Sequence, residues 1–266
     1  MPFVQGAESV GRDAQMPSFK HYIGVRYSGR KDPGDRIREI KVFGATEDHE
    51  PYQERNPGHA SGRWSRRDLA EWLLERLGEG EPYIIGLDHA FSFPQTYMDR
   101  NDLKSWDEFL KDFEDNWPTH QISVRELLPG NPRSGDPDEH RLTGRWTAFP
   151  KSVFQFDIQD SLAKASHAGL PWLDYLRRSG DRTHFWPFDG FDVPKGKSVI
   201  AEVRPARFRH RYPKEGLDKL EQDAYAICAW LQDRDRLGLL KPYFTPPLSE
   251  NEMERARLEG WILGVS

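Results

Sequence analysis

The stretch YIIGLDHAFSFP, residues 83–94, begins with an uninterrupted apolar run and places one carboxylate, Asp88, directly after it. A short continuous apolar run predicts a strand that is covered on both faces. In open α/β sheets, ligands bind beyond the carboxyl ends of such strands, which makes Asp88 a candidate site residue. An aspartate that caps the next turn or pairs with an arginine accounts for Asp88 equally well, because a buried charge needs a partner.

Two stretches upstream of this run predict an antiparallel hairpin. Residues 21–29, HYIGVRYSG, and residues 36–46, RIREIKVFGAT, show the apolar alternation of half-buried strands. The segment between them, GRKDPGD, is rich in turn formers, so the strands are expected to pair in opposite directions. Residues 65–78 then show helical spacing of Leu and Trp, with Ser65 as N-cap and Asp68 three residues later.

The rest of the chain continues the alternation of helices and strands. Residues 129–150 are rich in glycine, proline and charge, and predict a long loop. The remaining patterns predict a helix over 102–117, a helix over 161–178 that breaks near 169–171, a strand over 197–205, a helix over 217–235, and a short helix with an apolar terminus over 250–265. This order predicts an α/β fold, in which a mixed sheet opens with an antiparallel hairpin and is flanked by helices.

The composition bounds the class of protein. The 266 residues are 36% hydrophobic and include 15 Phe, 9 Trp and 9 Tyr, which is enough apolar mass for a core. We expect a loose tail over residues 1–18 and a single domain over 19–266, with a long loop insertion near 117–160. The one cysteine, Cys228, excludes an internal disulfide framework and a zinc site made of several cysteines. Without a long apolar run or an apolar N-terminus, a cytoplasmic protein with no membrane partner is expected.

Two further carboxylates fall where apolar side chains are expected. Asp223 lies beside the apolar stripe of the helix over 217–235, so its carboxylate is expected to point toward the sheet. Its place near the helix N-terminus accounts for tolerance of the charge but not for the inward direction. Glu202 shares a strand face with Ile200. If this face belongs to an edge strand and is exposed to solvent, the acidic residue is explained without a functional role. Acids from two strands and a helix can also converge on a divalent cation, which takes oxygen ligands.

Seven short motifs, taken in their shared order, resemble the DUF429-type family of predicted nucleases with a ribonuclease H-like fold. Together they cover most of the chain from about residue 21 to the end. They are IGVRYSGRKDPG (23–34), GLDHAFSFP (86–94), KASHAGLPWLDYLR (164–177), HFWPFDGF (184–191), SVIAEVRPARF (198–208), QDAYAICAWL (222–231) and EGWILGV (259–265).

The resemblance implies a metal-dependent nuclease that hydrolyses the phosphodiesters of nucleic acid. Asp88 matches the acid at the end of the fourth strand of that fold, and Asp223 matches the acid on its C-terminal helix. These two residues would bind Mg²⁺ or Mn²⁺, with Glu202 as a third ligand or as the residue that orients water. All three are therefore candidate catalytic and metal-binding residues.

The first strand departs from the family pattern at Arg26. Related proteins have an aspartate in this position, in a motif of the form GVD, aromatic residue, SG, whereas this chain has GVRYSG. An arginine does not ligate a cation, and its charge repels one. Arg26 can instead neutralise Asp88 or hold a phosphate through two hydrogen bonds.

Two more residues are candidates for phosphate binding. Arg204 replaces the tyrosine usual in the family and opens a basic run that extends to Arg211. The net charge of −5 argues against a generally basic nucleic-acid surface but leaves room for such a local patch. His167 is the other candidate, although a histidine that bonds the backbone at a helix break is the slightly favoured explanation.

The loss of the first acid supports an alternative function. The chain would then be a catalytically silent relative that binds nucleic acid or a nucleotide. A small-molecule phosphotransferase ranks third, because the chain has no second copy of the domain and no recognisable phosphate loop. The choice between DNA and RNA and the oligomeric state are open at this point.

Overall fold

The computed structural model describes residues 18–30, 32–158, 161–180 and 182–266, so the tail expected over residues 1–18 lies outside the described residues except for Ser18. Within this part of the chain, six strands form one mixed sheet in the order β3-β2-β1-β4-β6-β5. They are β1 (His21–Arg26), β2 (Lys41–Thr46), β3 (Tyr52–Glu54), β4 (Tyr83–Leu87), β5 (Thr183–Trp186) and β6 (Ser198–Glu202).

The pairing of the strands confirms the predicted fold class. β1, β2 and β3 are antiparallel neighbours, and β1, β4, β6 and β5 run parallel. An antiparallel start followed by parallel strands is the topology of the ribonuclease H-like fold. All five residues of β4 are buried, as the apolar run predicts. β3 and β5 were not predicted, because they are three and four residues long and carry too few residues for a clear periodicity.

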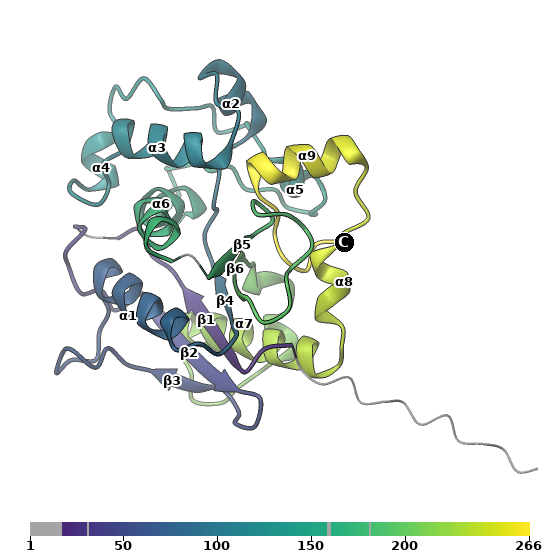
Figure 1. Cartoon of the computed structure of the whole chain (residues 1–266). Helices are drawn as coiled ribbons and strands as arrows, with labels where there is room; N and C mark the ends of the chain where they lie inside the picture. Colours follow the sequence, from purple (N-terminus) through teal and green to yellow (C-terminus); the bar gives the residue numbers. More distant parts are fainter. Residues whose placement is uncertain (1–17, 31, 159–160, 181) are drawn as a thin grey trace, which may run out of the picture.

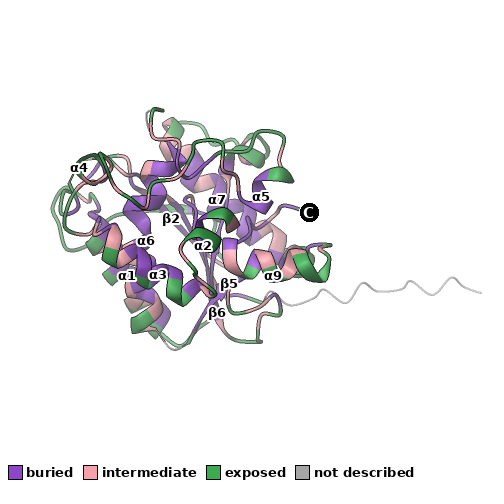
Figure 2. Ribbon diagram, turned by 90° about the horizontal axis from the view of Figure 1, so that it is seen from above, coloured by how far each residue is buried: buried purple, intermediate pink, exposed green. Residues whose placement is uncertain are grey.

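Helices cover both faces of the sheet (Figure 1). α1, α3 and α6 belong to the hydrophobic cluster on one face, and α7 packs on the other. Figure 2 shows the buried strands between these helices, whose exposed residues face outward. The helices are α1 (Arg66–Gly78), α2 (Gln95–Arg100), α3 (Trp106–Asn116), α4 (Val124–Leu127), α5 (Leu142–Arg145), α6 (Leu162–Ser179), α7 (Lys219–Arg236), α8 (Leu240–Phe244) and α9 (Glu250–Glu259), with short 3₁₀ turns η1 (Pro205–Arg207) and η2 (Arg209–Arg211).

Capping side chains set where the helices begin. The Ser65 side chain accepts from the Asp68 backbone and the Asp68 side chain accepts in return, which confirms the predicted capping box of α1. α3 begins at Trp106 rather than at residue 102, because the Ser105 side chain accepts from the backbone N–H of Glu108 and acts as its N-cap.

The predicted break in the helix over 161–178 is wrong, since α6 runs without interruption through Pro171. A proline inside a helix leaves the carbonyl four residues earlier without its N–H donor. That carbonyl belongs to His167, and the Thr119 hydroxyl donates a hydrogen bond to it. A residue distant in the sequence therefore replaces the missing bond.

Glycine allows α7 to lie very close to the sheet. A Cβ atom on Gly24 of β1 would clash with the Ala224 carbonyl oxygen and with the Cys228 backbone nitrogen of α7. This close approach brings the first turns of α7, including Asp223, to the end of β1.

The long loop and the C-terminus meet at the end of β6. Residues 117–160, expected as a loop insertion, contain only the short helices α4 and α5 in their described part. After α9 the chain forms a parallel bridge between Ile262 and Glu202, with Trp261 fully buried. None of the helices in the described ranges is long and apolar enough to span a bilayer.

Candidate functional site

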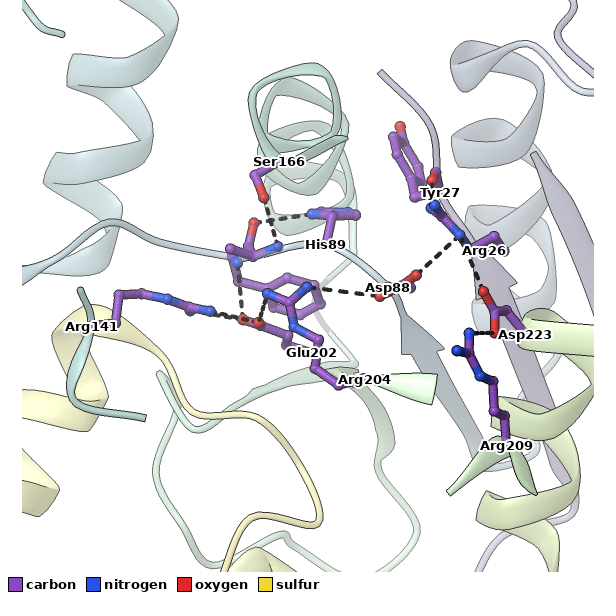
Figure 3. A network of polar contacts seen from close by, with 12 residues as sticks. Arg26, Tyr27, Asp88, His89, Arg141, Ser166, Glu202, Arg204, Arg209 and Asp223 are labelled. Carbon is purple, nitrogen blue, oxygen red and sulfur yellow. Dashed lines mark hydrogen bonds and ion pairs between the residues drawn. The ribbon is translucent and has the colours of Figure 1, made fainter. Parts of the chain in front are cut away.

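The carboxyl ends of three parallel strands bring the predicted site residues together (Figure 3). Arg26 is the last residue of β1, Asp88 follows β4 directly, and Glu202 is the last residue of β6. β4 lies between β1 and β6 in parallel register, so these three ends share one edge of the sheet. Asp223 reaches this edge from α7 and Arg204 from the residues just after β6.

Arg26 lies between the two aspartates. Its Nε atom is 3.3 Å from Asp88 Oδ2 and 3.7 Å from Asp223 Oδ2. The other carboxylate oxygen of Asp223 accepts a hydrogen bond from Arg209 Nη1 at 3.1 Å. Asp223 is only 6% exposed, so the inward direction predicted from the helical pattern is confirmed.

Glu202 is held by a second arginine group. The Arg141 guanidinium donates to both of its carboxylate oxygens, at 2.6 and 2.8 Å. The backbone N–H of Phe91 and Arg204 Nη2 also donate to it, at 3.3 and 3.4 Å. The explanation of Glu202 by a solvent-exposed edge strand is wrong, because β6 lies between β4 and β5 and Glu202 is 1% exposed.

Arg204 links the two groups of charges. Its Nη2 atom bonds Glu202, and its Nη1 atom lies 4.0 Å from Asp88 Oδ1. Lys151, from the long loop, is close enough to interact electrostatically with Arg204, Asp88, Arg26 and Arg209. The site therefore consists of three carboxylates, those of Asp88, Asp223 and Glu202, surrounded by arginines and a lysine.

Burial controls the ionisation of Asp88. It raises the pKa of this carboxyl to about 6, against the opposing effect of Arg26 and Arg204. Burial also lowers the pKa of Lys151, and the neighbouring Arg204 adds to that effect. A buried carboxyl that gains a proton close to neutral pH is the kind of group that active and binding sites use.

Hydrogen bonds fix the backbone that carries Asp88. The Asp88 N–H donates to the Val25 carbonyl at 3.0 Å. The Ala90 N–H donates to the Ser166 hydroxyl of α6 at 2.8 Å. Between them, the buried His89 ring lies 3.0 Å from the Ala90 carbonyl through Nδ1, and burial lowers its pKa to about 4. The position of Asp88 is thus set by β1 and α6 as well as by β4.

The donor set at this edge does not fit a divalent cation. The space next to both aspartates, where a bridging ion would bind, contains the Arg26 guanidinium, and Glu202 is engaged by Arg141. A fixed positive charge in this position repels a cation. Across residues 18–266, apart from those outside the description, no group of three or more His, Cys, Asp or Glu side chains could hold a metal ion. Binding of Mg²⁺ or Mn²⁺ by Asp88, Asp223 and Glu202, which the family resemblance implies, is therefore an untested expectation that this arrangement of charges disfavours.

His167 lies apart from this network. It is fully buried on α6, and its Nδ1 atom lies 2.9 Å from the Ala163 carbonyl. Aromatic rings surround it: Phe93, Phe113, Trp117, Phe154 and Phe156. The backbone hydrogen bond agrees with the explanation favoured from the sequence, although the helix does not break there. The described contacts of His167 do not include Arg26, Asp88 or Arg204.

Two residues of the site were not identified from the sequence. Arg141 precedes Glu202 by 61 positions and lies in the segment read as a loop, so no local spacing indicates the pair. The sequence indicated Arg141 only indirectly, since a buried Glu202 requires a cation nearby. Lys151 lies in the insertion near 117–160, and no sequence pattern indicated it as a site residue.

No protein-family model, curated protein or solved structure matches this chain. The resemblance to the DUF429-type family therefore rests on the sequence motifs and on the ribonuclease H-like topology.

Proposed function

We propose that this protein binds the phosphate groups of a nucleic acid or nucleotide without a metal ion. The observation that carries the proposal is the Arg26 guanidinium at the carboxyl edge of the sheet. Its Nε–H is buried and makes no hydrogen bond of good geometry in the described part of the chain, although carboxylate oxygens of Asp88 and Asp223 lie 3.3 and 3.7 Å away. A phosphate oxygen would supply the acceptor that this group lacks.

The surrounding charges favour an anion. Arg204, Arg209 and Lys151 add to Arg26, and they outnumber Asp88 and Asp223 in the part of the site not occupied by the Arg141–Glu202 pair. Arginine binds phosphate through two parallel hydrogen bonds, which makes a convergent set of guanidinium groups suitable for phosphodiesters. The ends of parallel strands are also where α/β folds bind their ligands.

One exposed aromatic residue favours an unpaired nucleotide over inorganic phosphate. Phe149 is 88% exposed, the largest exposed fraction among the large apolar side chains described. It precedes Lys151 by two residues, so their Cα atoms lie at most about 7 Å apart. A base attached to a phosphate bound near Lys151 would be within reach of the Phe149 ring, and such stacking contributes about 1–3 kcal/mol per base.

Fluorescence polarisation with a labelled single-stranded oligonucleotide, in the presence of EDTA, tests the proposal. We expect saturable binding that weakens with salt and becomes about tenfold weaker in Arg204→Gln and Arg209→Gln. Arg125→Gln, a change of the same kind on the exposed surface of α4, should bind like the wild type. Inorganic phosphate and nucleotides as competitors distinguish the two sources of the phosphate group.

The same experiment tests the alternative function, that of a metal-dependent nuclease. Binding that requires Mn²⁺, or cleavage of the oligonucleotide that Asp88→Asn abolishes, would contradict a metal-independent binder. Equal binding by the wild type, Arg204→Gln and Arg209→Gln would also contradict it, because the site would then contribute nothing.

A further inference from the structure

A cavity of about 690 Å³ lies at the opposite edge of the sheet from the arginine site. Ser18 and Phe19, which precede β1, line it together with Pro82, which precedes β4, and Lys197, which precedes β6. These are the amino ends of the parallel strands, whereas Asp88 and its partners lie beyond the carboxyl ends. The two sites are therefore separated by the length of the sheet.

The walls of the cavity are apolar and belong to the core. Phe19, from the start of the described chain, and Phe244, from α8, meet with their ring centroids 6.5 Å apart. Trp186 packs edge to face against Phe244 and Phe191, and its Nε1–H donates to the Phe244 carbonyl at 3.1 Å. Because these rings are packed against one another, the cavity walls are held in place without a ligand.

The charged residues around the cavity are mainly lysines. Lys195, Lys197 and Lys241 line it, against Asp192 and Asp235. Asp235 is buried and already accepts hydrogen bonds from the backbone N–H groups of Ser18 and Phe19 and from the Tyr22 hydroxyl, at 2.9–3.1 Å. Three lysines against two aspartates leave the lining with a net positive charge, which favours an anionic ligand.

We propose that this cavity binds a small amphiphilic organic acid. Its acidic group would lie at the lysines, and its apolar body would pack against the phenylalanines. The volume lies within the range of about 300–1,000 Å³ that is typical of small-molecule sites, and an apolar lining with a few charged groups is their usual composition. This proposal is independent of phosphate binding at Arg26, since it uses neither the same residues nor the same edge of the sheet.

The test titrates the full chain with anilinonaphthalenesulfonate, an aromatic sulfonate that fluoresces in apolar surroundings. We expect saturable binding at one site, displaced by dodecanoate and much less by dodecanol, which has the same chain without the acid. Reversing two charges in Lys195→Glu/Lys241→Glu should weaken binding by about tenfold or more. Val193 also lines the cavity, and filling it in Val193→Trp should abolish binding while leaving the Lys195 and Lys241 charges unchanged.

Lys111→Glu, an exposed charge reversal on α3, is the matched control and should bind like the wild type. Thermal unfolding of each variant establishes that it is folded before its affinity is compared. Binding that is unchanged in both cavity variants would overturn the proposal. Displacement by dodecanol as strong as by dodecanoate would overturn the role of the lysines. Either result would leave the prediction of oligonucleotide binding at the carboxyl ends of the strands unchanged.

Discussion

Arg26 decides what the carboxylates at the carboxyl edge of the sheet can do. The sequence left Asp88 with three possible partners: a backbone turn, an arginine and a metal ion. In the structure its side chain faces Arg26, with Arg204 at a slightly greater distance. Position 26 was identified as the departure from the family pattern because it falls within a motif. The partner of Glu202 could not be found that way, because Arg141 lies in a segment without periodicity.

Phosphate binding should depend on pH through Asp88. Burial raises the pKa of this carboxyl from 3.8 to about 6, so it is charged at pH 7.5 and protonated at pH 5. Protonation removes a negative charge beside Arg26, and a phosphodiester keeps its own charge throughout this range. We expect an oligonucleotide to bind about tenfold more tightly at about pH 5 than at about pH 7.5, a difference of about 1.4 kcal/mol.

The control for this prediction is Asp88→Asn, which is neutral at both pH values. Polarisation titrations should show most of the pH dependence lost and the affinity near its low-pH value. A variant that keeps the full pH dependence would assign it to other groups.

Removing Arg141 should destabilise the protein strongly. The Arg141 and Glu202 side chains are 4% and 1% exposed, and each supplies the main charge partner of the other. Arg141→Met leaves Glu202 buried with only Arg204 nearby, and loss of one partner of such a pair costs about 3–5 kcal/mol. Urea denaturation measures the change. Arg125→Met should cost little, and adding Glu202→Gln to Arg141→Met should recover part of the loss.

At the scale of elements, long patterns and end signals predicted that most of the helices and strands exist, but not every boundary or break. The hairpin of β1 and β2, the buried β4, the capped α1 and the helix α7 all follow from periodicity and end signals. Local rules failed where a distant residue changed the outcome. Pro171 predicts a break in α6, and only the fold reveals that Thr119 satisfies the freed carbonyl.

Thr119 and Pro171 should therefore be coupled. Thr119→Val leaves the His167 carbonyl buried without a donor, which costs about 1–3 kcal/mol. Pro171→Ala restores an N–H within the helix that can donate to the same carbonyl. We expect the double variant to lose less stability than Thr119→Val alone, as measured by chemical denaturation. Strictly additive effects would show that the two residues act independently.

The contact between α7 and β1 should tolerate no side chain at position 24. The atoms that a Cβ on Gly24 would meet belong to the α7 backbone, so Gly24→Ala must shift the helix. We expect a loss of about 1–3 kcal/mol of stability. Gly78→Ala, at the end of α1 with no atom within 4 Å of the added carbon, is the matched control and should be neutral. Equal thermal stability of the two variants would contradict this description of the packing.

At the scale of the whole molecule, the fold alone does not determine the function. The mixed sheet has the ribonuclease H-like topology that the motifs predict, but one topology hosts many activities. We propose that the charge at position 26 makes this edge of the sheet an anion site and not a metal site. The cavity at the amino ends of the strands has no sequence motif, because its walls come from segments that only the fold brings together.

Isothermal titration of Mn²⁺ into the metal-free wild type and into Arg26→Asp tests directly whether Arg26 excludes a cation from the two aspartates. We expect no saturable Mn²⁺ binding by the wild type, because the Arg26 guanidinium lies beside both aspartates. We expect binding by Arg26→Asp, which adds a third carboxylate and removes the repelling charge. Saturable binding by the wild type that is lost in Asp88→Asn would contradict a metal-free anion site and would favour the metal-dependent nuclease.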